Sequence, residues 1–166
     1  MDYNTLTMSK QVEEMVGVIL RQRGWRLALA ESCTGGLISH RITNIPGSSD
    51  YFLGSVIAYA YEAKIMLLSV NQETLDKYGA VSRETALEMA RGVCKVLGAE
   101  VGLSISGIAG PGGGTPEKPV GLTWIGLSMP DYENAWQRNW MGNRLKIKEQ
   151  AAEEALKLLL NHLTLR

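Results

Sequence analysis

Three short stretches of this 166-residue chain combine hydroxyl, amine and glycine groups in ways that could do chemistry. The first is ESCTGG, residues 31–36, which directly follows a short apolar run. A serine at a strand-to-helix turn can expose its hydroxyl at a helix N-terminus, where backbone N–H groups hold an oxyanion or a phosphate. Ser32 is therefore a candidate nucleophile. Two alternatives stay open: Ser32 or Thr34 only caps the helix, or the neighbouring Cys33 is the nucleophile rather than an inert buried thiol.

The second stretch is YAYEAK, residues 59–64, which follows a run rich in aromatic and β-branched residues. A lysine at the end of a strand can enter an apolar cleft, where desolvation lowers its pKa and leaves a neutral amine. Lys64 could then accept the proton of Ser32 in a serine–lysine arrangement. The alternative is an ordinary solvated lysine on a helix.

The third stretch is SGIAGPGGG, residues 106–114, in a loop that holds six glycines and three prolines between residues 107 and 121. Glycines let the main chain approach a ligand and aim successive N–H groups at an anion. Neither GxxxxGK[ST] nor GxGxxG is present, so this is not a known nucleotide-binding fingerprint. A flexible loop is the alternative, and Lys118 within it faces either a ligand or water.

Composition excludes several other classes of function. The only histidines are His40 and His162, too few for a zinc site and unpromising for a Ser-His-Asp triad, so we expect no metal. The two cysteines form no CxxC motif, which predicts a reducing, cytoplasmic setting without disulfides. A net charge of zero gives no nucleic-acid footprint. We expect no signal peptide and no membrane span, because no apolar run reaches about 18 residues.

Hydrophobic periodicity predicts elements that would bring the three stretches together. Helices are predicted over residues 8–24, 37–43, 62–68, 71–77, 82–97 and 144–163, and strands over 26–30, 51–61, 101–106, 120–128 and 135–141. In the helical patterns Met15 and Val96 fall on the inner face and Glu13 on the outer face. Interleaved helices and strands predict a layered α/β fold with a mixed sheet, closed by an antiparallel hairpin, in a single domain over 1–166. Each stretch then follows a strand, at the end of the sheet where ligands gather.

Five motifs in order resemble one known family. They are AESCTGG (30–36), the tyrosine–lysine segment, GAVS (79–82), SGIAGPGGG (106–114) and EKPVG (117–121). Together they resemble the C-terminal domain of the competence/damage-inducible protein CinA, over nearly the whole chain. Family members that consist of this domain alone are nicotinamide-nucleotide amidohydrolases. The domain that precedes it in longer members is not expected here, and none of its activities is assigned.

The resemblance implies a three-layer α/β/α fold and a reaction. Nicotinamide mononucleotide and water would give nicotinate mononucleotide and ammonia, in pyridine-nucleotide recycling, through a serine–lysine dyad without a cofactor or metal. Ser32 matches the family serine and Lys64 the family lysine. Tyr59 matches the preceding tyrosine and would orient the lysine or relay the proton.

Substrate contacts are expected from the first motif, the glycine-rich loop and the start of the last helix. The expected residues are Glu31, Cys33, Thr34, Gly35, Gly36, Ser106, Gly107, Gly110 and Arg144. The chain departs from the family pattern at Ser55, Ala60, Tyr61, Asn143 and Lys148. A catalytically silent nucleotide-binding module of the same fold is therefore the alternative function. An interaction protein is a third class, and a homo-oligomer is compatible with the sequence.

Overall fold

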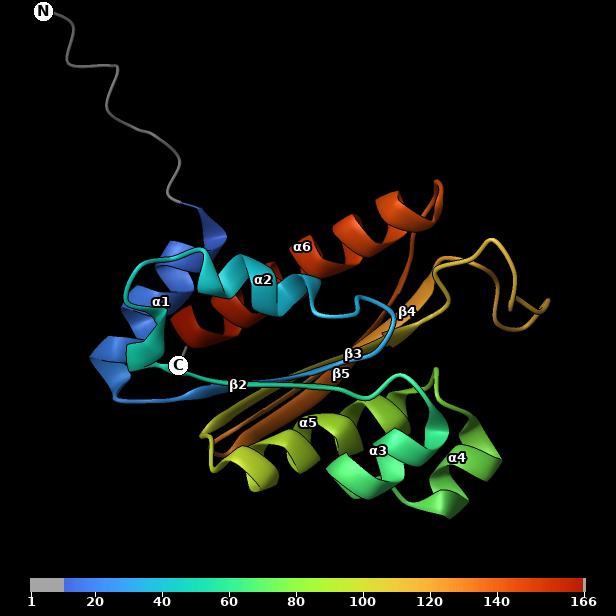
Figure 1. Ribbon diagram of the computed structural model, residues 1–166, viewed down its shortest axis with the longest axis horizontal. Coiled ribbons are helices and arrows are strands. Elements are labelled where there is room, and N and C mark those ends of the chain that lie inside the picture. The colour runs from blue at the N-terminus through green and yellow to red at the C-terminus, as the bar shows by residue number, and fades with distance from the viewer. Residues whose placement is uncertain (1–10, 166) are drawn as a thin grey trace, which may run out of the picture.

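One mixed sheet of five strands forms the centre of the computed structural model, which describes residues 11–165 (Figure 1). The strand order is β2-β1-β3-β4-β5. The strands are β1 (Leu27–Glu31), β2 (Phe52–Ile57), β3 (Val101–Gly107), β4 (Leu122–Met129) and β5 (Tyr132–Asn139). β1 pairs in parallel with β2 and β3, whereas β4 is antiparallel to both β3 and β5. The predicted mixed sheet and its closing hairpin are confirmed.

Helices cover both faces of the sheet, which confirms the three-layer α/β/α arrangement (Figure 1). One layer contains α1 (Val12–Arg23), α2 (Leu37–Thr43) and α6 (Arg144–Thr164). The other contains α3 (Tyr61–Leu68), α4 (Gln72–Tyr78) and α5 (Arg83–Leu97). A short 3₁₀ helix, η1 (Ser48–Asp50), precedes β2.

The parallel register aligns the ends of three strands. Glu31, the last residue of β1, lies opposite Ile57 of β2 and Ile105 of β3. The segments that follow β1, β2 and β3 therefore leave the sheet on the same side, at the carboxyl ends of these parallel strands. These segments are the three stretches that the sequence singles out.

Several boundaries differ from the predicted ones. β2 ends at Ile57, four residues before the predicted end, because the chain turns there into α3. β5 begins at Tyr132, three residues before the predicted start. Its polar residues Glu133 and Asn134 look like loop in the sequence, but β5 lies at the edge of the sheet and exposes alternate side chains. Residues 8–10 of the first predicted helix lie outside the described residues.

The helix nearest the N-terminus corrects one prediction of side-chain placement. Val16 and Leu20 of α1 are buried, but Met15, which was predicted to face inward, is exposed, and Glu13, predicted to face outward, is buried. Glu13 forms an ion pair with Arg41 of α2, and Arg41 also pairs with Glu153 of α6 at 2.7 Å. Periodicity cannot distinguish such a buried ion pair from a solvated carboxylate.

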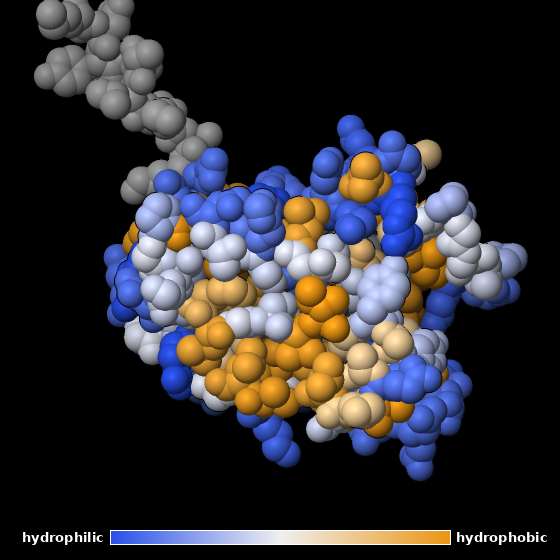
Figure 2. All heavy atoms as spheres, viewed as in Figure 1, coloured by the Kyte–Doolittle hydropathy of each residue, from blue (hydrophilic) through white to orange (hydrophobic). Residues whose placement is uncertain are grey.

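Val96, the other residue predicted to point inward, is exposed in the last turn of α5. Figure 2 shows apolar side chains gathered over the region where β2 forms the edge of the sheet, and β2 exposes Leu53 and Ile57.

Within residues 11–165, no helix combines the length and hydropathy needed to cross a membrane.

Candidate active site

The turn after β1 carries Ser32 to the edge of the sheet. The Ser32 N–H donates to the Ile105 carbonyl of β3 at 3.0 Å, and the Ser32 carbonyl accepts from the Gly35 N–H at 3.0 Å. Gly35 and Gly36 have φ angles of 62° and 101°, in the left-handed region that side chains disfavour. These glycines let the chain reverse within a few residues and enter α2, with Ser32 at the bend.

Lys64 comes from the first turns of α3 and reaches back to Ser32. The Lys64 Nζ lies 3.0 Å from the Ser32 Oγ, 2.6 Å from the Ala58 carbonyl and 3.3 Å from the Tyr59 carbonyl. Both side chains are nearly enclosed, with 1% of Lys64 and 7% of Ser32 exposed. The structure thus brings together the two residues that the sequence proposes as base and nucleophile.

The three neighbours of Lys64 fit both protonation states of its amine, since the ammonium can donate one N–H to each of them. A neutral amine has two N–H donors and one lone pair, and a carbonyl oxygen can only accept. If Ala58 and Tyr59 take the two N–H groups, the lone pair is left for the Ser32 hydroxyl proton. This geometry suits a base that removes a proton from Ser32.

Burial lowers the pKa of Lys64 to about 8, against a smaller opposing effect of the nearby Cys33 side chain. The charged form of a buried amine loses its hydration, so the neutral form becomes accessible. At neutral pH roughly a tenth of the molecules would carry Lys64 as the free amine.

Cys33, the rival nucleophile, lies next to Ser32 but is buried. Burial raises the pKa of the Cys33 thiol to about 11. Because the thiolate is the reactive form, a thiol with this pKa is a poor nucleophile at neutral pH. The geometry and protonation states favour Ser32.

The Glu31 side chain, which was expected to contact the substrate, is enclosed by the turn and helix that follow it. Its side chain is 0% exposed, and both carboxylate oxygens accept hydrogen bonds from the following turn and helix. The Thr34 hydroxyl donates to Glu31 at 2.6 Å and is also buried. Thr34 can therefore meet a substrate only through its main chain.

Most N–H groups of the turn are already in use. Ser32 donates to Ile105, Gly35 to Ser32 and Gly36 to the Glu31 carboxylate. Among the residues that the structure describes, the N–H groups of Cys33 and Thr34 have no hydrogen bond to another residue. These two amides are the donors that an oxyanion beside Ser32 could use.

Tyr59, Arg144 and the glycine-rich loop form one connected group. The Arg144 Nη2 donates to the Tyr59 hydroxyl at 2.8 Å, and its Nη1 donates to the Gly110 carbonyl at 2.7 Å. Tyr59 is 59% exposed, and it meets Lys64 through its carbonyl. The contact between the Tyr59 carbonyl and Lys64 suits the predicted orienting role, and the proton relay through the Tyr59 hydroxyl stays a prediction.

Lys148 is a second cation near the site, which the sequence marks only as a departure from the family pattern. The Lys148 Nζ lies 3.8 Å from the position that a Cβ on Gly35 would occupy. Lys148 is one helical turn after Arg144 on α6, so the i,i+4 spacing could have indicated that both cations share a face.

The remaining predicted residues have main-chain partners. The Ser106 hydroxyl donates to the Ala80 carbonyl at 2.7 Å, which leaves its side chain little scope for a substrate. The Lys118 amine donates to the Tyr78 carbonyl. Gly107 ends β3 opposite Thr123 of β4. No group of three His, Cys, Asp or Glu side chains that could hold a metal ion occurs within residues 11–165.

Comparison with known proteins shows which family this chain belongs to. The model of the CinA C-terminal domain matches residues 9–163. The chain belongs to this family. A putative competence-damage inducible protein of Moorella thermoacetica is 50% identical over 158 residues, which are 95% of this chain and 38% of the relative. The chain spans 36–38% of the length of the first curated relatives it matches.

Solved structures of the family share the fold. A CinA superfamily protein from Klebsiella pneumoniae has a TM-score of 0.88 and 30% identity, and the match covers 95% of this chain and all of that chain. A competence/damage inducible protein from Agrobacterium tumefaciens has a TM-score of 0.84 and 38% identity, covering 90% and 95%.

Proposed function

We propose that this member of the CinA C-terminal domain family is an amidohydrolase that uses Ser32 as its nucleophile and Lys64 as its base. One observation carries the proposal: the buried Lys64 amine lies 3.0 Å from the Ser32 hydroxyl, and two carbonyls can accept the two hydrogens of its neutral form. The proposed substrate is nicotinamide mononucleotide, which the motif resemblance supports.

In the first half of the reaction, neutral Lys64 accepts the Ser32 proton as the Ser32 oxygen bonds to the carboxamide carbon. The negative charge on the carboxamide oxygen is stabilised by the N–H groups of Cys33 and Thr34. One such donor is typically worth about 3 kcal/mol in the transition state. The Lys64 ammonium then protonates the amide nitrogen, the carbon–nitrogen bond breaks, and ammonia leaves.

In the second half, a water molecule attacks the acyl ester on Ser32. Lys64 accepts a proton from this water and returns a proton to the Ser32 oxygen as the ester bond breaks. The products are nicotinate mononucleotide and free Ser32. The positive charge of the pyridinium ring makes its carboxamide more electrophilic, so no activating group is required.

Arg144, with Lys148 beside it on α6, would hold the phosphate of the nucleotide. A guanidinium matches the oxygens of a phosphate in a bidentate manner, and Tyr59 and Gly110 already orient the one in Arg144. A substrate phosphate would thus lie at the edge of the site, with the carboxamide toward Ser32.

The test is ammonia release from nicotinamide mononucleotide by the purified protein in the presence of a chelator. We expect release from the wild type, and a loss of at least about 10³-fold in Ser32→Ala. Ser49→Ala is the matched control, because it removes the same hydroxyl from an exposed serine outside the site.

Two results would contradict the proposal. Substantial turnover by Ser32→Ala would remove Ser32 as the nucleophile. A wild type that binds the nucleotide without releasing ammonia would make the chain a silent nucleotide-binding module, the function that its departures at Ala60, Tyr61 and Asn143 would favour.

A further inference from the structure

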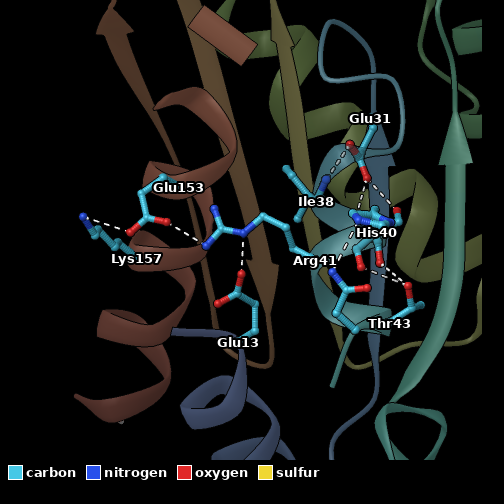
Figure 3. Close-up of polar contacts among 10 residues, drawn as sticks. Glu13, Glu31, Ile38, His40, Arg41, Thr43, Glu153 and Lys157 are labelled. Carbon is cyan, nitrogen blue, oxygen red and sulfur yellow. Dashed lines mark hydrogen bonds and ion pairs between the residues drawn. The ribbon is translucent and has the colours of Figure 1, made fainter. Parts of the chain in front are cut away.

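Glu31 is a fully buried carboxylate to which the proposed reaction gives no role. Its Oε2 accepts from the Thr34 hydroxyl at 2.6 Å, the Gly36 N–H at 3.0 Å and the Ile38 N–H at 3.2 Å. Its Oε1 accepts from the Ser39 N–H at 2.8 Å and the Ser39 hydroxyl at 2.6 Å. Figure 3 shows Glu31 at the start of α2, with several of these bonds converging on its carboxylate.

The five donors come from the turn that carries Ser32 and from the helix that follows it. Thr34 and Gly36 belong to the turn itself, whereas Ile38 and Ser39 belong to the first turn of α2. An ordinary helix cap satisfies one or two N–H groups. This carboxylate joins the turn to the helix as one unit, and buried hydrogen bonds to a charged acceptor are the strong ones.

The main chain of Glu31 reaches the other half of the dyad. Its carbonyl accepts from the Ala58 N–H at 2.9 Å, and the Ala58 carbonyl accepts from the Lys64 amine at 2.6 Å. Glu31 is therefore bonded through its side chain to the turn of the nucleophile and through its carbonyl to the segment that holds the base.

We propose that Glu31 is a positioning residue. Its carboxylate holds the Ser32 turn so that the hydroxyl stays within hydrogen-bond reach of Lys64 and the N–H groups of Cys33 and Thr34 stay available to an oxyanion. The turnover measurement that tests this inference rests on the proposed function, whereas the chemical-labelling measurement does not.

Glu31→Gln removes this role at almost unchanged size. One carboxylate oxygen becomes an NH₂ group, and each of the two oxygens accepts at least one main-chain N–H. A main-chain N–H cannot become an acceptor, so either orientation of the amide sets two donors against each other. The turn must shift to relieve the contact.

A matched control is a second buried carboxylate that bonds the same helix, α2. Glu13 is also buried, and it bonds Arg41 in the last turn of α2, away from the turn of Ser32 (Figure 3). Glu13→Gln therefore disturbs the packing of α2 without touching the segment between β1 and α2. The pair of variants separates loss of stability from loss of positioning.

The experiment compares wild type, Glu31→Gln and Glu13→Gln by three measurements. These are the melting temperature, the kcat and KM for nicotinamide mononucleotide, and the rate at which a sulfonyl fluoride labels Ser32, followed by mass spectrometry. We expect Glu31→Gln to lower kcat and the labelling rate by about a hundredfold, the effect of a displacement of about 1 Å, with KM little changed. Glu13→Gln should lower the melting temperature while leaving both rates within about twofold.

If Glu31→Gln fails to fold, Thr34→Val and Ser39→Ala take its place, since each removes one hydroxyl donor to Glu31. Each should then slow labelling of Ser32 several-fold. Labelling as fast as in the wild type, in Glu31→Gln or in both of these variants, would overturn the inference. So would a wild-type Ser32 that the reagent does not label, because there would be no activated hydroxyl to position.

The two proposals can fail separately. A wild type that is labelled at Ser32 in a Glu31-dependent manner but releases no ammonia would refute the proposed substrate and support the positioning role. Ammonia release and labelling that are both indifferent to Glu31→Gln would support the amidohydrolase and refute the positioning role.

Discussion

At the scale of single residues, the environment of Lys64 decides what the site can do. A lysine in water is protonated at neutral pH and cannot act as a base. Here 1% of the side chain is exposed and its hydrogen-bond partners are two carbonyls and one hydroxyl, with no carboxylate among them. The amine is therefore poised to exchange a proton with Ser32 near neutral pH.

The pH dependence of turnover should report this amine. We expect kcat/KM to rise about tenfold per pH unit below the Lys64 pKa and to level off above about 8, because only the neutral amine accepts the Ser32 proton. Initial rates of ammonia release between pH 6 and 9.5 would measure the profile. A flat profile over this range would rule out Lys64 as the base.

Arg144 should affect binding more than chemistry. Its guanidinium is held by Tyr59 and Gly110, so Arg144→Ala should raise KM for nicotinamide mononucleotide about ten- to a hundredfold, the range expected for a charged hydrogen bond. Its KM for nicotinamide riboside, which has no phosphate, should change little. Lys157→Ala is the control, because it removes a cation from the same helix. If Arg144→Ala raised KM equally for the nucleotide and the riboside, the phosphate contact would be refuted.

At the scale of elements, α5 lies unusually close to the strands that support the site. A Cβ on Gly102 of β3 would lie 2.2 Å from the Ala90 carbonyl of α5, and one on Gly126 of β4 would lie 2.4 Å from the Ala86 carbonyl. The Ser104 hydroxyl, between them on the sheet, donates to the Ala86 carbonyl at 2.5 Å. Small residues on the sheet thus set the distance between the two layers.

Gly102→Ala should separate these layers. We expect it to lower the free energy of unfolding by about 1–3 kcal/mol, since main-chain atoms of α5 cannot yield as a flexible side chain would. Gly112→Ala, where nothing lies within 4 Å, should change it by less than about 0.5 kcal/mol. Urea titrations of both variants would test this, and equal stabilities would show that the close approach is not needed.

At the scale of the whole molecule, burial of Lys64 couples the site to folding. The folded chain releases the Lys64 proton at a pKa of about 8, whereas the unfolded chain holds it up to about 10.5. Between these values the unfolded state binds more protons, so this residue makes stability rise with pH across that window. Below pH 8 the full cost of burying the charge is present.

Lys64→Met should remove this pH dependence. We expect the difference in unfolding free energy, wild type minus variant, to increase steadily from pH 8 to 10.5, measured by urea titration at each pH. Subtracting the variant cancels the other groups that titrate in this range. A constant difference would mean that Lys64 keeps its ordinary pKa in the folded protein, and a difference that falls with pH would mean that folding raises this pKa.

Local patterns were enough to predict much of the site and fold. The turn glycines after Ser32, the lysine after an apolar strand and the glycine-rich loop each signal chemistry within a few residues, and alternation of helices and strands predicts the layers. Helical periodicity failed at Glu13, and no local pattern showed that the Glu31 side chain is buried. A carboxylate reads as solvent-facing in a sequence, and only its distant or main-chain donors make burial favourable.

The sequence alone determined the elements, their order and the kinds of group that meet at one edge of the sheet. Tertiary structure decided which of these groups touch. The lowered pKa of Lys64 depends on the enclosure of its amine. The carbonyls of Ala58 and Tyr59 that hold this amine are groups that every residue possesses and that no side-chain pattern reveals. Desolvation and main-chain geometry arise only when the chain closes around the amine, so they belong to the folded molecule.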